Sequence, residues 1–333
     1  MASNGRVFFR GRYAIKRYKV LLRILVSIVI ILLLWHNING RSIIDEISQI
    51  TPQIILLLVV LYISSTCFQT LKWKVLMHEV SFLMLFKGLM YSRLFSVIMP
   101  GQMFGEVAKT VVISRDINNY KLATSSVVLD KSTSVIALAI TGVFGVAFSK
   151  AEIPITVLFS ILFSLLLMIL VLILIRYDRF FMATTKMLSV ISRKLPKLKN
   201  ISDKVVVFFT VLKDTTRIRP IIYSILVGVL VNYLAAVQIR IICISLNVDV
   251  SIIDLLWVYT ILSAILMIPI SFAGIGTRDI TLVSALSFLS VPSIKALSVS
   301  LVLLSFTVLW ALIGGIIALY DILKPRSIGE SEL

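Results

Sequence analysis

The chain has 333 residues, of which 59% are hydrophobic and 15% charged, and its formal net charge is +17. Because soluble domains carry roughly 45–50% apolar and about 25% charged residues, this composition excludes a water-soluble enzyme, a disordered chain and a nucleic-acid-binding module. It predicts an all-α integral membrane protein. Only two histidines are present, so we expect no metal site, no cofactor and no catalytic triad.

Apolar runs indicate the membrane spans. A transmembrane helix needs about 20 predominantly apolar residues, and six such runs occur, at 20–36, 52–71, 122–148, 153–175, 220–246 and 295–320. Two further apolar stretches, 82–99 and 252–272, each end in a segment with proline and glycine. The sequence therefore predicts six full spans and two interrupted segments.

The basic residues predict the orientation. The first 23 residues contain seven basic and no acidic residues, and 176–219 contains eleven basic and three acidic residues. Cytoplasmic segments carry an excess of Lys and Arg, so we expect both to be cytoplasmic. The predicted organisation is a basic cytoplasmic N-terminus (1–19), one transmembrane domain in the cytoplasmic membrane (20–322) with a cytoplasmic amphipathic segment (176–219), and a cytoplasmic tail (323–333).

In this orientation neither of the two interrupted segments can cross the whole membrane. Lys72-Trp73-Lys74 returns the second span to the cytoplasm, and the span at 122–148 must start there, so the chain between them enters and leaves on one side. The same reasoning makes the later stretch enter from outside. We expect two opposed re-entrant helical hairpins, at 82–114 and 252–291, interrupted at Pro100, Gly101 and Gly105 and at Pro269, Gly274 and Gly276.

The two halves of the chain resemble each other weakly. The aligned pairs include Ser125 with Ser298, Gly142 with Gly315, Gln69 with Gln238, Lys72 with Arg240, and Val80-Ser81 with Val250-Ser251. In the predicted topology the two copies face opposite directions. The sequence therefore predicts an inverted internal repeat, an arrangement of many secondary transporters.

Motifs near the interruptions resemble those of a known family. They are Arg93…Pro100-Gly101…Gly105-Glu106…Lys109, then Asp130-Lys131, then Pro269…Gly274-Ile275-Gly276-Thr277-Arg278-Asp279. The chain resembles the lysylphosphatidylglycerol synthase transmembrane region, also called flippase-like membrane proteins, over roughly residues 15–322. The family's synthases add a soluble aminoacyl transferase domain, which we do not find in this sequence. The resemblance therefore implies lipid flipping rather than the synthase reaction.

Charged residues within predicted membrane segments are the candidate site. They are Arg93, Glu106, Lys109, Asp130, Lys131, Arg240, Arg278 and Asp279. A charge at the bilayer centre costs about 2.5–3.5 kcal/mol on insertion scales, so each needs a partner. We expect Asp130 and Lys131 to find partners on the hairpins, and Asp279 to orient Arg278 or pair with Lys131. The set has two more positive than negative charges, which suits a phosphate or diphosphate. A structural ion-pair lattice is the alternative interpretation.

The predicted function is transport of a phosphate-bearing lipid, such as an aminoacylated phospholipid or a polyprenyl-phosphate-linked sugar, across the cytoplasmic membrane. One alternative is a membrane glycosyltransferase that uses a polyprenyl-phosphate sugar, which would need an essential carboxylate at a membrane face. Another is a non-catalytic assembly partner of an envelope-biosynthesis enzyme. The expected partners are an anionic lipid, a second copy of the chain or such an enzyme, but not nucleic acid.

Overall fold

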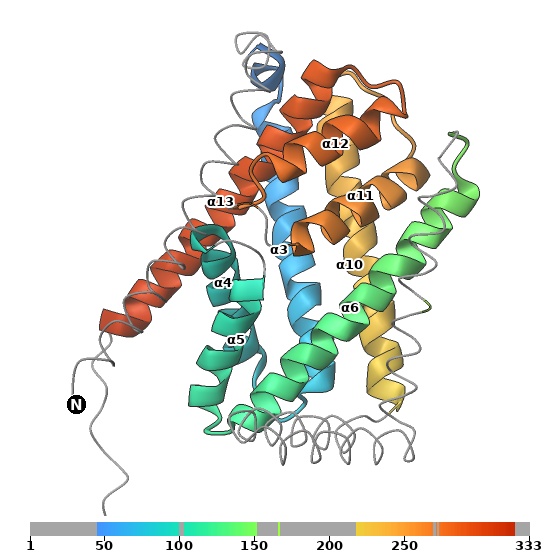
Figure 1. The fold of residues 1–333 in the computed structure, drawn as a ribbon. Helices are drawn as coiled ribbons and strands as arrows, with labels where there is room; N and C mark the ends of the chain where they lie inside the picture. Colours follow the sequence, from blue (N-terminus) through green and yellow to red (C-terminus); the bar gives the residue numbers. More distant parts are fainter. Residues whose placement is uncertain are drawn as a thin grey trace, which may run out of the picture.

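The computed structural model describes residues 45–99, 103–151, 166, 218–268, 271 and 273–323. These ranges contain no strand and form eight labelled helices (Figure 1). The helices are α3 (Pro52–Leu76), α4 (Phe82–Ile98), α5 (Met103–Asp116), α6 (Tyr120–Phe148), α10 (Ile218–Ser245), α11 (Ile252–Met267), α12 (Thr277–Ser287) and α13 (Ser293–Leu323).

Four of these helices are long and apolar enough to cross a membrane: α3, α6, α10 and α13. They correspond to four of the six predicted spans. The other two, at 20–36 and almost all of 153–175, lie outside the described residues, as does most of the segment 176–219. The prediction of an all-helical membrane protein is confirmed, and the number of spans stays a prediction.

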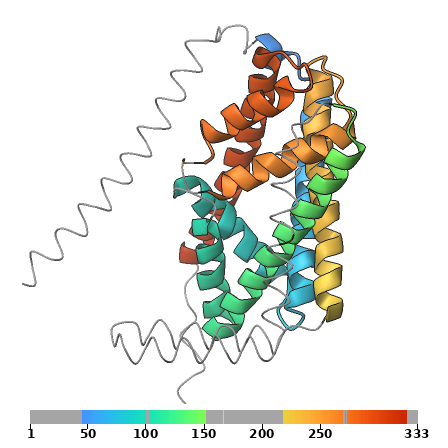
Figure 2. The ribbon, with the colours of Figure 1, turned by 45° about the vertical axis from the view of Figure 1, so that its right-hand side comes forward.

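Two pairs of shorter helices separate the long ones. The α4–α5 pair has helices of 17 and 14 residues, and the α11–α12 pair has helices of 16 and 11 residues. In Figures 1 and 2, α4–α5 begins and ends at the lower end of the molecule, whereas α11–α12 begins and ends at the upper end. At 1.5 Å per residue, each helix is shorter than the roughly 30 Å hydrocarbon core of a bilayer. The pairs occupy 82–116 and 252–287, close to the predicted bounds of 82–114 and 252–291.

Equivalent capping residues begin the two helix pairs. The Ser81 side chain accepts a hydrogen bond from the Met84 N–H at the start of α4, and the Ser251 side chain accepts one from the Ile253 N–H at the start of α11. Serine is a preferred N-cap because its oxygen satisfies a free amide of the first helical turn. Buried valines, Val80 and Val250, precede the caps. The aligned Val-Ser pairs therefore have the same structural role.

Each helix pair packs against the last long helix of the other half of the chain: α4 lies against α13, and α11 lies against α6. Glycines permit both approaches. A Cβ at Gly142 would lie 2.6 Å from the Thr260 side chain of α11, and one at Gly314 would meet the Met90 carbonyl of α4. The two halves are thus interlocked rather than merely adjacent.

The buried apolar residues form two main clusters. The smaller surrounds α4–α5 and includes Trp73, Leu85 and Ile113. The larger surrounds α11–α12 and includes Leu255 and Leu282. Each helix pair therefore packs on an apolar cluster of its own. Polar side chains that lie between the two clusters are not needed to form either core.

Candidate functional site

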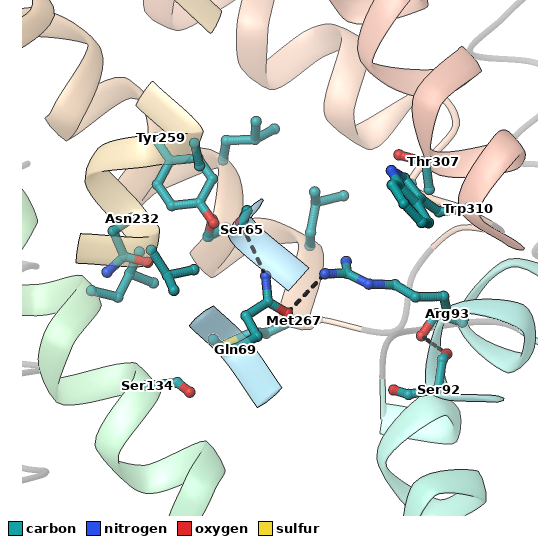
Figure 3. Close-up of a pocket in the computed structure, with 18 of the residues that line it drawn as sticks. Ser65, Gln69, Ser92, Arg93, Ser134, Asn232, Tyr259, Met267, Thr307 and Trp310 are labelled. Carbon is teal, nitrogen blue, oxygen red and sulfur yellow. Dashed lines mark hydrogen bonds between the residues drawn. The ribbon is translucent and has the colours of Figure 1, made fainter. Parts of the chain in front are cut away.

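A cavity of about 360 Å³ is lined by residues from all eight labelled helices. Figure 3 shows its polar wall, with Ser65 and Gln69 from α3, Arg93 from α4 and Asn232 from α10 around the open space. Most of the predicted charged residues reach this cavity. A polar cavity of this kind among membrane-spanning helices is the candidate site.

Asp130 is the centre of a buried ion-pair network. Its Oδ1 lies 2.7 Å from the Lys72 Nζ of α3, and its Oδ2 lies 2.7 Å from the Lys109 Nζ of α5. The lysine side chains are only 4% and 1% exposed. Lys72 also donates to the Asp130 carbonyl and to the Ser134 hydroxyl. Asp130 therefore finds one of its partners on the α4–α5 pair and joins three helices.

Lys109 has two further contacts that hold it in place. Its Nζ lies 3.2 Å from Glu106 Oε2, one helical turn away, and 4.2 Å from the centre of the Trp73 ring. A cation over an aromatic face is attracted by the ring quadrupole, whose negative part lies on the face of the ring. The Lys109 ammonium therefore ties α5 to both α3 and α6.

Lys72 belongs to the site although the sequence analysis placed it at the cytoplasmic surface. Lys72 is only 3% exposed, and it lines the cavity. Lys74, two residues later, instead donates to the His78 and Val80 carbonyls at the end of the helix. The available signal was the three-residue spacing between Gln69 and Lys72, which places both on one helix face.

Arg278 lines the cavity at the start of α12. It follows Gly274 and Gly276, which both have positive φ (76° and 81°), so the interruption predicted at these glycines coincides with left-handed turns. The arginine is 3% exposed, yet its Nε and Nη2 have no hydrogen-bond acceptor among the described residues. A buried guanidinium with two nitrogens that lack acceptors is a candidate partner for an anionic ligand.

Of the two roles expected for Asp279, pairing with Lys131 is not observed, whereas support of Arg278 is, through the backbone and not through an ion pair. Its Oδ2 accepts a hydrogen bond from the Gly276 N–H at 2.8 Å, and its Oδ1 accepts one from the Ser300 hydroxyl of α13. It does not line the cavity. Both oxygens therefore fix the start of α12, and Asp279 positions the preceding arginine through the backbone.

Two uncharged donors that belong to residues of the cavity wall were not found from the sequence. Gln238 and Trp310 line the same cavity, and their Nε2 and Nε1 are buried without an acceptor among the described residues. Unpaired buried donors are costly, about 1–3 kcal/mol each. No sequence pattern signals an unpaired indole N–H, because Trp310 lies in an ordinary apolar helix.

The remaining predicted residues divide into three groups. Arg93 and Lys131 line the cavity; Arg93 donates to Gln69 at 2.8 Å, and Lys131 has no ion pair among the described residues. Arg240 is not brought to the cavity, and Gly105 lies within α5 rather than at an interruption. Pro100, Gly101 and Pro269 lie outside the described residues.

The cavity is strongly cationic. Five basic side chains (Lys72, Arg93, Lys109, Lys131 and Arg278) and two carboxylates (Glu106 and Asp130) line it, which leaves a formal charge of +3. Among the described residues, no group of three or more His, Cys, Asp or Glu side chains could hold a metal ion. The arrangement suits an anionic group with several acceptor oxygens.

The comparisons with known proteins agree with this chemistry. The family model described as "Lysylphosphatidylglycerol synthase TM region" matches residues 20–315. No curated protein and no solved structure matches the chain significantly. Since the matched range covers most of the chain, the protein belongs to the lysylphosphatidylglycerol synthase transmembrane-region family, a membrane domain associated with lipid flipping or synthesis.

Proposed function

We propose that this protein is a flippase that moves a phosphate-bearing lipid across the cytoplasmic membrane, with the headgroup passing through the central cavity. The observation that carries the proposal is the formal charge of +3 on the cavity wall, to which the buried Arg278 contributes a guanidinium with no carboxylate within 4 Å and no acceptor for its Nε and Nη2 among the described residues. Gln238 and Trp310 line the same cavity, and each has a buried donor without an acceptor among the described residues.

The energetics favour an anionic ligand. A charged side chain inside a membrane costs about 2.5–3.5 kcal/mol on insertion scales unless a partner offsets the cost. A phosphate group supplies both negative charge and acceptor oxygens, and an arginine can bind it through two parallel N–H···O bonds. A phosphate headgroup in the cavity would therefore compensate the excess positive charge of its wall.

The helix order supports an inverted repeat. The first half, α3 to α6, and the second half, α10 to α13, both follow the order long, short, short, long. The halves run in opposite directions in Figure 1, and the aligned pair Gln69 and Gln238 both line the cavity. Inverted repeats place substrate sites near the bilayer midplane, where one half can rock against the other. We propose this arrangement for alternating access to the cavity.

In this proposal α4–α5 and α11–α12 are re-entrant hairpins from opposite faces of the membrane. Interrupted backbone at membrane depth is tolerated where it is packed in protein or lines a polar cavity, and both pairs contribute residues to the cavity wall. The excess of basic residues in the sequence up to Arg219 supports a cytoplasmic position for the start of α10, which lies at the lower end in Figure 1, and the basic N-terminal sequence supports a cytoplasmic N-terminus.

The glycosyltransferase alternative has less support. A transferase needs a carboxylate free to act on its substrate, but Asp130 is held by two lysines and Glu106 lies 3.2 Å from Lys109. Neither carboxylate combines exposure with freedom from a lysine. Transport requires no such group, so it is the better explanation of the site.

Lipids that copurify with the protein provide the first test. Mass spectrometry of the purified protein should find a phosphate-bearing lipid enriched over its level in the bulk membrane. Arg278→Gln should reduce the enrichment, and Arg278→Lys should reduce it less, because Lys keeps the charge but loses the planar fork. Equal enrichment in all three folded proteins, or no enrichment in any, would contradict the proposal.

A further inference from the structure

We propose that the central cavity selects a headgroup with at least two negative charges, a terminal phosphate or a diphosphate, over a phosphodiester. This inference rests on the proposed function and names the chemical class of the lipid. It follows from which of the cavity's charges are already compensated within the protein.

Two of the five cations are compensated. Lys72 lies 2.7 Å from Asp130, and Lys109 lies within 3.2 Å of both Asp130 and Glu106. All four groups are close together, and their formal charges cancel. This part of the wall therefore has no net formal charge and needs no charge from a lipid.

Three cations remain: Arg93, Lys131 and Arg278. None of them has a carboxylate within 4 Å among the described residues. The one side-chain partner of Arg93 there is the neutral amide of Gln69, at 2.8 Å. These three side chains, from α4, α6 and α12, account for the whole formal charge of +3.

A phosphodiester does not match this set. It carries one negative charge and two unesterified oxygens, and so it would leave two of the three cations uncompensated in the membrane. A terminal phosphate carries about −1.5 to −2 at pH 7 and has three acceptor oxygens. A diphosphate has more of both.

The three uncompensated cations distinguish between the two lipid types that the sequence leaves open. An aminoacylated phospholipid has a phosphodiester whose single negative charge is offset by the ammonium of its amino acid. A lipid with a terminal phosphate, or a diphosphate-linked headgroup, keeps its negative charge. The compensated and uncompensated cations therefore favour the second type.

The test measures binding of three soluble short-chain lipids to the full chain in detergent by calorimetry. Dihexanoyl-phosphatidic acid has a terminal phosphate, and dihexanoyl-phosphatidylglycerol has identical acyl chains but a phosphodiester. Farnesyl diphosphate carries the diphosphate on an isoprenoid chain. The first pair isolates the effect of headgroup charge, and the third lipid distinguishes a monophosphate from a diphosphate as the preferred group.

We expect phosphatidic acid, farnesyl diphosphate or both to bind about tenfold more tightly than phosphatidylglycerol, which corresponds to about 1.4 kcal/mol. Lys131→Gln and Arg93→Gln should each reduce this preference about threefold or more, because each removes one uncompensated cation. Lys121→Gln is the matched control; it removes one charge at an exposed position outside the cavity and should preserve the preference.

Two results would overturn the inference. One is binding of phosphatidylglycerol within about threefold of the tighter of the other two lipids. The other is a preference that neither Lys131→Gln nor Arg93→Gln changes, with both proteins folded by thermal melting. Arg278→Gln distinguishes failure of this inference from failure of the proposed function. If it weakens binding of all three lipids, the cavity still binds phosphate and only the charge preference is wrong.

Discussion

Replacing Asp130 by Asn should destabilise the protein by about 3 kcal/mol. Breaking a buried ion pair by removing one partner typically costs about 3–5 kcal/mol, because an uncompensated charge stays buried. Lys109 keeps Glu106 at 3.2 Å, whereas Lys72 has no second carboxylate within 4 Å among the described residues. The cost therefore falls mainly on Lys72, which places the estimate at the lower end of the range.

A second substitution identifies the source of the loss. Adding Lys72→Met to Asp130→Asn removes the uncompensated ammonium and keeps most of the side-chain volume, so the double variant should recover at least about 1 kcal/mol. Adding Lys109→Met should recover less, because that lysine retains its other carboxylate. Unfolding in mixed micelles with increasing dodecyl sulfate, followed by tryptophan fluorescence, gives the free energies.

Two results would refute this reasoning. If Asp130→Asn were as stable as the unmodified protein within about 0.5 kcal/mol, the carboxylate would not be compensating two buried ammonium groups. If the two double variants recovered equally, the assignment of the cost to Lys72 would be wrong.

Three further predictions concern packing and positioning. Gly145→Ala should cost about 1–3 kcal/mol in the same unfolding assay, because the new Cβ would lie 2.7 Å from the Trp257 backbone nitrogen. Gly315→Ala is the control; its Cβ would meet its nearest atom at 3.5 Å, so stability should change by less than about 0.5 kcal/mol. Equal losses would contradict the close approach of α6 and α11. Asp279→Ala should lower stability by about 1–3 kcal/mol, since it leaves the N–H at the start of α12 without its acceptor; an unchanged melting temperature would show that the cap is not needed. Lys87→Met removes an ion pair to an aspartate near the end of α13 but should cost less than about 1 kcal/mol because the lysine is 31% exposed, and a larger loss of stability would contradict this weak contribution.

Composition was sufficient to predict the helical class, and Gly274 and Gly276 marked the turn before α12. Apolar runs of about 20 residues indicated the long helices, and Gly274 and Gly276 indicated a turn because both adopt positive φ. The need of Asp130 for a partner on a hairpin was also predictable, since neighbouring residues on a helix diverge by about 100° and Lys131 could not serve.

Other parts of the site were not predicted, for identifiable physical reasons. Lys72 was not predicted as a site residue, because lysines at the ends of spans usually lie at the cytoplasmic surface. Lys72 lies near the end of α3 but on its buried face. Arg240 was predicted to belong to the site but does not line the cavity. Residues two positions apart on a helix point about 200° away from each other. Because Gln238 lines the cavity, Arg240 faces away from it. The partners of Asp279 depend on Ser300 in a distant helix, and no local pattern reveals that contact.

The most direct test of the central claim is a lipid translocation assay in sealed vesicles reconstituted with the full chain. A fluorescent short-chain phosphatidic acid reports the rate at which the lipid becomes accessible in the opposite leaflet. We predict that the unmodified protein accelerates this movement over protein-free vesicles, and that Arg278→Gln, reconstituted in equal folded amount, lowers the protein-dependent rate about tenfold or more, corresponding to the loss of a charge-assisted hydrogen bond. Equal protein-dependent rates for the two proteins, or no acceleration over protein-free vesicles, would contradict passage of the headgroup through the cavity.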